Sequence, residues 1–84
     1  MKIVFHKHFK KRFQKVPKKI QEQFYNRLDL FMENMSHPVL NVHRLEGSYS
    51  ECFSINITAD YRAIFKKELS VVTFILIGTH SELY

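Results

Sequence analysis

The spacing of apolar residues changes about halfway along the chain. In the N-terminal half, a short apolar segment at residues 2–5 predicts a strand, and apolar side chains then recur every three or four positions. The first set predicts a short basic amphipathic helix that ends at Pro17: Phe9, Phe13 and Val16. The second set marks one face of a longer helix, which ends before His37 and Pro38: Ile20, Phe24, Leu28, Phe31 and Met35. This half therefore predicts a strand followed by a helical hairpin.

From Tyr49 onward the apolar residues alternate with polar ones, which is typical of strands. Residues 58–60 predict a turn that places Ile57 opposite Tyr61 in a hairpin. In that register one face collects the apolar side chains: Phe53, Ile55, Ile57, Tyr61, Ala63 and Phe65. The other face collects Ser54, Asn56, Arg62, Ile64 and Lys66. A slip of one residue would mix the two sets, so the pattern favours this register.

The last apolar run, residues 71–77, is apolar on both faces, which indicates a central strand. If this strand runs antiparallel to the one before it, its end returns beside Tyr61. His80 then lies near Asp60 and Arg62. The predicted fold class is α+β with the order βααβββ: an antiparallel sheet, a two-helix hairpin on one face and an open polar face on the other.

Positive charge is concentrated at the N-terminal end. The chain of 84 residues has a net charge of +5, and residues 1–19 contain eight lysine or arginine residues without one acidic residue. Such an end favours binding to a polyanion, or to an acidic protein that competes with it, although a solvated helix face would have the same composition. The candidate cations for a nucleic-acid backbone are Lys10, Lys11 and Arg12 of the first helix and Lys66 of the sheet.

Composition also limits where the protein works. Its one cysteine, Cys52, has no partner within the chain for a disulfide, which is typical of a reducing cytoplasm. No apolar run approaches a length of about 20 residues, which a membrane-spanning helix requires. We therefore expect a single cytoplasmic domain of residues 1–84 with no membrane contact.

The predicted open face offers acid, base and phosphate-binding groups but no activated nucleophile. Asn56 and Arg62 lie on it, with Asp60 and His80 at its rim. RNA cleavage needs no protein nucleophile, because the 2′-OH of the substrate attacks the adjacent phosphorus. Histidine suits the proton transfers and arginine the phosphate charge. Two alternatives remain open: Asp60 as a turn residue, and Arg62 paired with Glu51 on the sheet surface.

A metal cofactor is not expected from the histidines near the N-terminus. His6 and His8 are two positions apart, but no acidic or thiol side chain accompanies them. We therefore predict metal-free chemistry without a cofactor.

Two segments resemble the YafQ branch of the RelE/ParE superfamily of bacterial toxins. Residues 43–49, His-Arg-Leu-Glu-Gly-Ser-Tyr, are similar to its His-x-Leu-x-Gly-Ser-aromatic segment, and residues 78–84, Gly-Thr-His-Ser-Glu-Leu-Tyr, are similar to its Gly-Thr-His-x-x-Leu-Phe tail. The resemblance implies a RelE-like fold of the microbial-ribonuclease type. It also implies that His43 lies in the active site, that His80 is catalytic and that Tyr84 stacks on a base.

The same resemblance extends to residues near the predicted hairpin. Asp60 matches an active-site aspartate of the branch, and Arg62 falls where RelE-like members have a catalytic arginine. One position departs from the pattern: Asn56 stands where the branch has another active-site histidine, and an amide forms hydrogen bonds but transfers no proton at neutral pH.

The resemblance implies a type II toxin that cleaves messenger RNA on the ribosome and forms a heteromeric complex with a cognate antitoxin. Two alternatives are a ParE-like inhibitor of DNA gyrase without nuclease activity, and an inactive relative that serves as an antitoxin-binding module. His43, His80 and Tyr84 argue against the first, whereas Asn56 leaves the second open.

Overall fold

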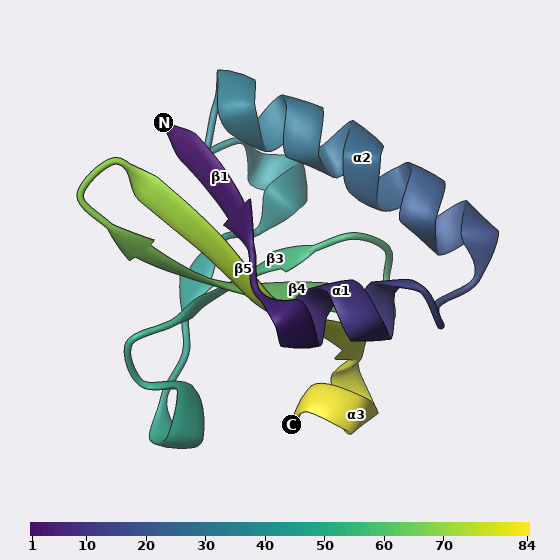
Figure 1. Cartoon of the computed structure of the whole chain (residues 1–84). Coiled ribbons are helices and arrows are strands. Elements are labelled where there is room, and N and C mark those ends of the chain that lie inside the picture. Colours follow the sequence, from purple (N-terminus) through teal and green to yellow (C-terminus); the bar gives the residue numbers. More distant parts are fainter.

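The computed structural model describes the backbone of residues 1–84 and every side chain except that of Ser48. One sheet of five strands has the order β1-β5-β4-β3-β2 (Figure 1). The strands are β1 Lys2–Phe5, β2 His43–Arg44, β3 Phe53–Asn56, β4 Tyr61–Glu68 and β5 Val71–Thr79. The helices are α1 Lys7–Phe13, α2 Lys18–Glu33 and α3 His80–Leu83, and two 3-10 turns span Pro38–Leu40 and Gly47–Tyr49. The predicted α+β class is confirmed.

The hairpin of β3 and β4 has the register that the alternation predicts. Ile55 pairs with Ala63, and Ile57 N–H donates to the carbonyl of Tyr61 at 2.9 Å. The connecting turn has no glycine. Instead Thr58 Oγ1 accepts a hydrogen bond from Tyr61 N–H at 3.1 Å, which closes the turn with a side chain. This register sets the positions of all later site residues.

Two features of the sheet differ from the prediction. β1 runs parallel to β5, with Phe5 opposite Phe74, so the sheet is mixed and the expectation of a wholly antiparallel sheet is wrong at this edge. The predicted four strands also omit β2, which pairs His43 with Ser54. An apolar run of four residues carries no information about the direction of its partner, and a strand of two residues is too short to show alternation.

Aromatic side chains fill the space between the sheet and the helices α1 and α2. Phe74 of β5 is fully buried, and its ring centroid lies 5.4 Å from that of Phe24, 5.9 Å from Phe31 and 5.6 Å from Phe65. We call this side of the sheet the helix face, because α1 and α2 cover it (Figure 1). Aromatic pairs at these separations add to the gain from burial, so the helix face is the main source of stability.

The opposite side of the sheet, which carries Ser54, Arg62 and Ile64, is called the site face. It was predicted to be open and polar, but Ser54 and Ile64 are fully buried. Ile64 forms a second apolar cluster with Leu45, which follows β2, and Leu83 of α3. The prediction of an open face is therefore wrong for its centre, because two leucines outside the predicted strands fold over it.

Within the described residues, no helix has both the length and the apolar character that crossing a membrane requires.

Candidate functional site

The C-terminal turn α3 is built by a reciprocal cap at its start. Thr79 Oγ1 accepts a hydrogen bond from Glu82 N–H at 3.2 Å, and Glu82 Oε1 accepts one from Thr79 N–H at 2.7 Å. This capping box ends β5 and begins the helix at His80. The hydrogen bond from Thr79 N–H to the carboxylate is the largest cause of a lowered pKa of the Glu82 carboxyl, and the Thr79 side chain and the charge of Arg12 lower it further.

His80 is the first residue of α3, and it lies against the turn between β3 and β4. Its N–H donates to the carbonyl of Asp60 at 2.9 Å, so the strand order places the two residues side by side. One helical turn later, the ring of Tyr84 meets that of His80 edge to face, with centroids 4.8 Å apart. The three side chains are exposed, which leaves an imidazole, a carboxylate and an aromatic ring open to a ligand.

Arg62 is the second residue of β4, and it pairs with Gly78 of β5. Its Nη1 donates to the carbonyl of Thr58 at 2.8 Å and to that of Tyr61 at 3.2 Å. These bonds fold the guanidinium over the turn, and the structure records no bond from Nε or Nη2 to another described residue. The predicted alternative of a pair with Glu51 is not formed.

Asn56 is the cross-strand partner of Arg62 on the site face. Its Oδ1 is buried and has no hydrogen-bond partner among the described residues. A buried acceptor without a donor costs about 1–3 kcal/mol, so Asn56 is held on the site face at a cost in stability.

His43 lies on β2 and is fixed by two contacts. Its Nδ1 is 2.9 Å from the carbonyl of Asn41, and its Nε2 is 3.2 Å from Ser54 Oγ. Because a carbonyl only accepts, Nδ1 carries a proton, and in the neutral ring Nε2 then accepts from the hydroxyl. Two strands separate β2 from β5, so the backbones of these strands lie about 14 Å apart, and the His43 and His80 rings can serve one phosphate only by reaching toward each other over β3 and β4.

The predicted cations lie in three different settings. Lys66 is at the far end of β4 from Arg62, and its ammonium lies 3.1 Å from Glu68 and 4.0 Å from Glu51. The hydrogen bond to Glu68 raises the pKa of Lys66, and both carboxylates add to the shift by charge. Lys10 and Lys11 are exposed on α1. Arg12 is half-buried and reaches the end of β5, where its Nε donates to the carbonyl of Ile77 at 2.8 Å.

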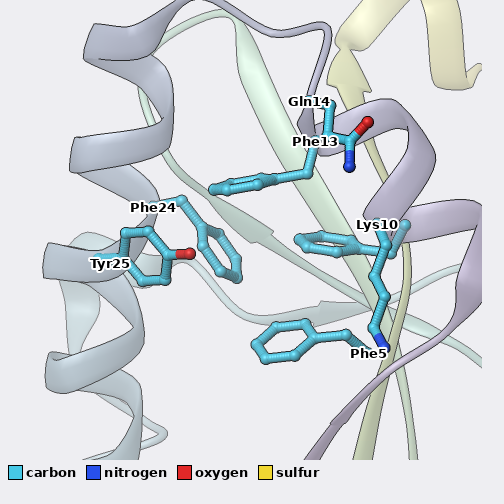
Figure 2. A pocket seen from close by; sticks show the side chains of 7 residues that line it. Phe5, Lys10, Phe13, Gln14, Phe24 and Tyr25 are labelled. Atoms are coloured by element: carbon cyan, nitrogen blue, oxygen red, sulfur yellow. The ribbon is translucent and has the colours of Figure 1, made fainter.

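A separate pocket of about 240 Å³ lies between α1 and α2, and Figure 2 shows aromatic rings from both helices facing each other across it. Its lining residues are Phe5, Phe9, Lys10, Phe13, Gln14, Phe24 and Tyr25. The pocket has no histidine or carboxylate, so we place the candidate chemistry at the turn between β3 and β4 and not here.

Among the described residues, no group of three or more His, Cys, Asp or Glu side chains is arranged to hold a metal ion.

Three residues that organise the site were not predicted from the sequence. Ser54 contacts His43, and Thr79 with Glu82 builds α3. The Thr79-x-x-Glu82 spacing is the signature of a capping box, so the helix start was detectable from sequence. Ser54 gave no such signal, because its contact depends on a strand of two residues. Ser48 of the His43–Tyr49 segment lies outside the described side chains.

Comparison with protein families gives one match over the whole chain. The family model described as "Bacterial toxin of type II toxin-antitoxin system, YafQ" matches residues 1–84. Among curated protein sequences, none matches the chain.

Several solved structures share the fold. YafQ of E. coli strain BL21(DE3) is 20% identical, with a TM-score of 0.83 over 98% of this chain and 96% of that chain. The E. coli DinJ-YafQ complex has a matching chain at 21% identity and a TM-score of 0.81, covering 98% of this chain and 96% of that chain. A YoeB/ParE toxin from Agrobacterium tumefaciens is 18% identical, with a TM-score of 0.78 over 95% of this chain and 99% of that chain.

Proposed function

The chain belongs to the YafQ family of bacterial type II toxins, and from that membership we propose that it is an endoribonuclease that cleaves messenger RNA on the ribosome. The observation that carries the proposal is the cluster at the turn between β3 and β4, where His80 lies against Asp60 and Arg62 lies opposite Gly78. The side chains of His80 and Asp60 are exposed, which leaves them open to a polymer such as RNA.

The proposed reaction uses the substrate's own 2′-hydroxyl. This oxygen attacks the adjacent phosphorus, a bond from O2′ to phosphorus forms, and the bond from phosphorus to O5′ breaks. The products are a 2′,3′-cyclic phosphate and a free 5′-hydroxyl, so one proton must leave O2′ and one must reach O5′. His80 and His43 are the candidates for these transfers, with Asp60 as partner or base, and each such group contributes about 10²–10⁴-fold. Since the nucleophile belongs to the substrate, the scheme requires no metal ion.

Arg62 and Tyr84 have the complementary roles of binding charge and base. The guanidinium of Arg62 is held over the turn through Nη1, so we assign Nε and Nη2 to a phosphate oxygen in the transition state. Tyr84 is about half exposed, at 47%, and presents its ring for stacking on an unpaired base.

Asn56 is assigned to the substrate and not to proton transfer. Its Oδ1 lacks a donor in the free protein, and once the side chain turns outward a ribose hydroxyl or an exocyclic amino group of a base would supply one. The reaction then proceeds with two site histidines, His43 and His80, where the family pattern has a third.

The exposed lysines of α1 are assigned to the phosphate backbone of messenger or ribosomal RNA. Lys10 and Lys11 are fully available for this role. Lys66 shares its charge with two carboxylates, so we expect it to contribute less. By analogy with the DinJ-YafQ complex, the expected protein partner is a cognate antitoxin, acidic enough to compete for this basic surface in the cytoplasm.

The test is growth arrest and RNA cleavage by wild-type protein and two variants. Induced wild-type protein should stop translation, and its antitoxin should restore growth. His80→Ala should cut the cleavage rate by roughly 10²-fold or more, and Tyr84→Ala should cost about 1–3 kcal/mol of substrate positioning. Both side chains are exposed, so thermal melting should stay close to wild type.

Two results would refute the proposal. A well-folded His80→Ala protein that cleaves at the wild-type rate would remove His80 from the mechanism. Growth arrest with intact messenger RNA and blocked DNA gyrase would assign the protein to the gyrase inhibitors.

A further inference from the structure

Arg12 joins three elements at the end of β5. It projects from α1, its Nε donates to the carbonyl of Ile77, and its Nη2 lies 3.9 Å from Glu82 Oε2 of α3. Figure 1 shows α3 directly beside α1, although the two helices lie at opposite ends of the sequence. One side chain therefore holds the first helix, the last strand and the C-terminal turn together.

Gly78 leaves the space that this side chain occupies. A Cβ at position 78 would lie 2.8 Å from Arg12 Nη2, 3.2 Å from Glu82 Oε1 and 3.4 Å from a methyl carbon of Leu83. The first distance is shorter than real Cβ contacts, so a methyl group here would push the Nη2 end of the flexible Arg12 side chain away from its position beside Glu82. The glycine is explained by this close approach and not by backbone conformation, since no left-handed φ is found at this position.

The C-terminal turn needs such support because it is only four residues long. An isolated helix shorter than about 12–15 residues is marginal in water. Its capping box binds Thr79 to Glu82, and Leu83 anchors its end in the apolar cluster of the site face. Arg12 adds the link from outside, on the carboxylate that caps the helix start.

We propose that Arg12 is a positioning residue, which fixes α3 and thereby holds His80 and Tyr84 at the site, and that residue 78 is glycine to admit its guanidinium. The proposal rests on the proposed function for its catalytic consequence, because it assigns His80 to the reaction. It also differs from a role of Arg12 as one more cation for the RNA backbone.

Kinetics separate these two roles of Arg12. Arg12→Gln removes the charge and the paired geometry, and a small displacement of a catalytic group lowers the chemical step, so kcat should fall about 10-fold or more with little change in KM. If Arg12 instead bound the RNA backbone, its replacement would raise KM and reduce the salt dependence of substrate affinity. Arg12→Lys keeps the charge but has a single nitrogen, which does not reach both the carbonyl of Ile77 and Glu82, so it should not restore kcat.

A double-mutant cycle with Gly78→Ala gives a sharper test. This change adds one methyl group and alters no charge, but it moves the Nη2 end of Arg12 away from Glu82, so kcat should fall, though less than in Arg12→Gln. The double variant should be no slower than Arg12→Gln alone, because both changes break the same interaction. The matched control is Lys67→Gln: Lys67 Nζ donates to the carbonyl of Leu69 at 3.0 Å, so this variant loses a bond from a cation to a backbone carbonyl at the turn before β5, away from α3 and from the site. Its kcat should stay at the wild-type value.

Amide hydrogen exchange provides a readout that does not depend on cleavage. The N–H groups of Tyr84 and His80, which donate to His80 O and Asp60 O, should exchange several-fold faster in Arg12→Gln and Gly78→Ala than in wild type and Lys67→Gln. Unchanged exchange at these amides, or unchanged kcat in Gly78→Ala, would overturn the proposal. If wild-type protein cleaves no RNA, the proposed function fails, and the exchange rates alone then decide the role of Arg12.

Discussion

The two faces of the sheet are held by different kinds of contact. On the helix face, rings from both helices and the sheet pack around Phe74, which is fully buried. On the site face, the apolar cluster has only three buried members, Leu45, Ile64 and Leu83, and hydrogen bonds and an ion pair position the rest. Burial of apolar area supplies most of the stability of a domain, so the helix face is expected to carry the fold. The site face is then free to keep polar side chains exposed, at the cost of weak local support.

The largest effect that tests this comparison is the loss of a core ring. Phe74→Ala leaves a cavity among Phe24, Phe31 and Phe65 and should cost about 3–5 kcal/mol, a large part of the 5–15 kcal/mol available to a typical domain. Leu83→Ala, at the edge of the small cluster, should cost about 2 kcal/mol, the low end for such changes. Urea unfolding of the two variants measures both values.

A loss of unfolding free energy in Leu83→Ala that equals or exceeds the loss in Phe74→Ala would contradict the comparison of the two faces. Equal losses for Leu83→Ala and Phe74→Ala would mean that the two faces form one cooperative core. Substrate cleavage should also separate the variants: Leu83→Ala should lose activity while still folded, because the buried leucine anchors the turn that carries His80.

The same contrast explains which parts of the structure the sequence predicts. Alternation between polar and apolar residues specifies the register of β3 and β4, and an unbroken apolar run identifies β5 as central. These signals are local and repeat over several residues. Because antiparallel pairing of β5 with β4 returns the end of β5 to Tyr61, the neighbourhood of His80, Asp60 and Arg62 was predictable as well.

Other contacts of the site lie beyond such patterns. The bond between Arg12 and Ile77 joins residues 65 positions apart, and nothing in the composition of the basic helix distinguishes Arg12 from its lysine neighbours. The burial of Ile64 depends on Leu45 and Leu83, which no predicted strand contains. The start of α3 differs from these contacts, because the spacing of Thr79 and Glu82 is a local sequence signal for a helix start.

A second, smaller effect tests whether function is confined to the site face. Lys10 and Lys11 lie on the helix that covers the other face, yet they are proposed to bind RNA backbone. Replacing both with Gln should weaken ribosome binding and reduce the slope of log affinity against log salt by about 0.7–0.9 for each phosphate that is no longer neutralised. The fold should persist, because both side chains are exposed.

Lys18 and Lys19 at the start of α2 provide the matched control for this experiment. They are exposed lysines in the same basic segment, but they lie beyond Pro17 on the next helix. Equal changes from both pairs would indicate a diffuse charge effect. A salt slope that is unchanged by the Lys10 and Lys11 replacements would leave α1 as a solvated helix, and the comparison of the two faces would become sharper.

The smallest effect concerns acid and the C-terminal turn. The pKa of Glu82 is below its ordinary value of 4.5, first because its carboxylate accepts the N–H of Thr79, then through the Thr79 side chain and the charge of Arg12. A group whose pKa is lower in the folded state stabilises that state fully above its unfolded pKa, and the contribution is lost as the pH falls through the folded value. α3 should therefore loosen below about pH 4.5 while the aromatic core stays packed.

NMR shifts of the Glu82 and Tyr84 amides, followed from pH 6 to pH 3 against ring protons of Phe74, measure the two regions separately. Glu82→Gln should abolish this step, because the amide still accepts from Thr79 N–H but has no charge to lose. If the amide shifts of α3 move together with those of the Phe74 ring, the turn and the core respond to acid as one unit, and the separation between the two faces does not hold.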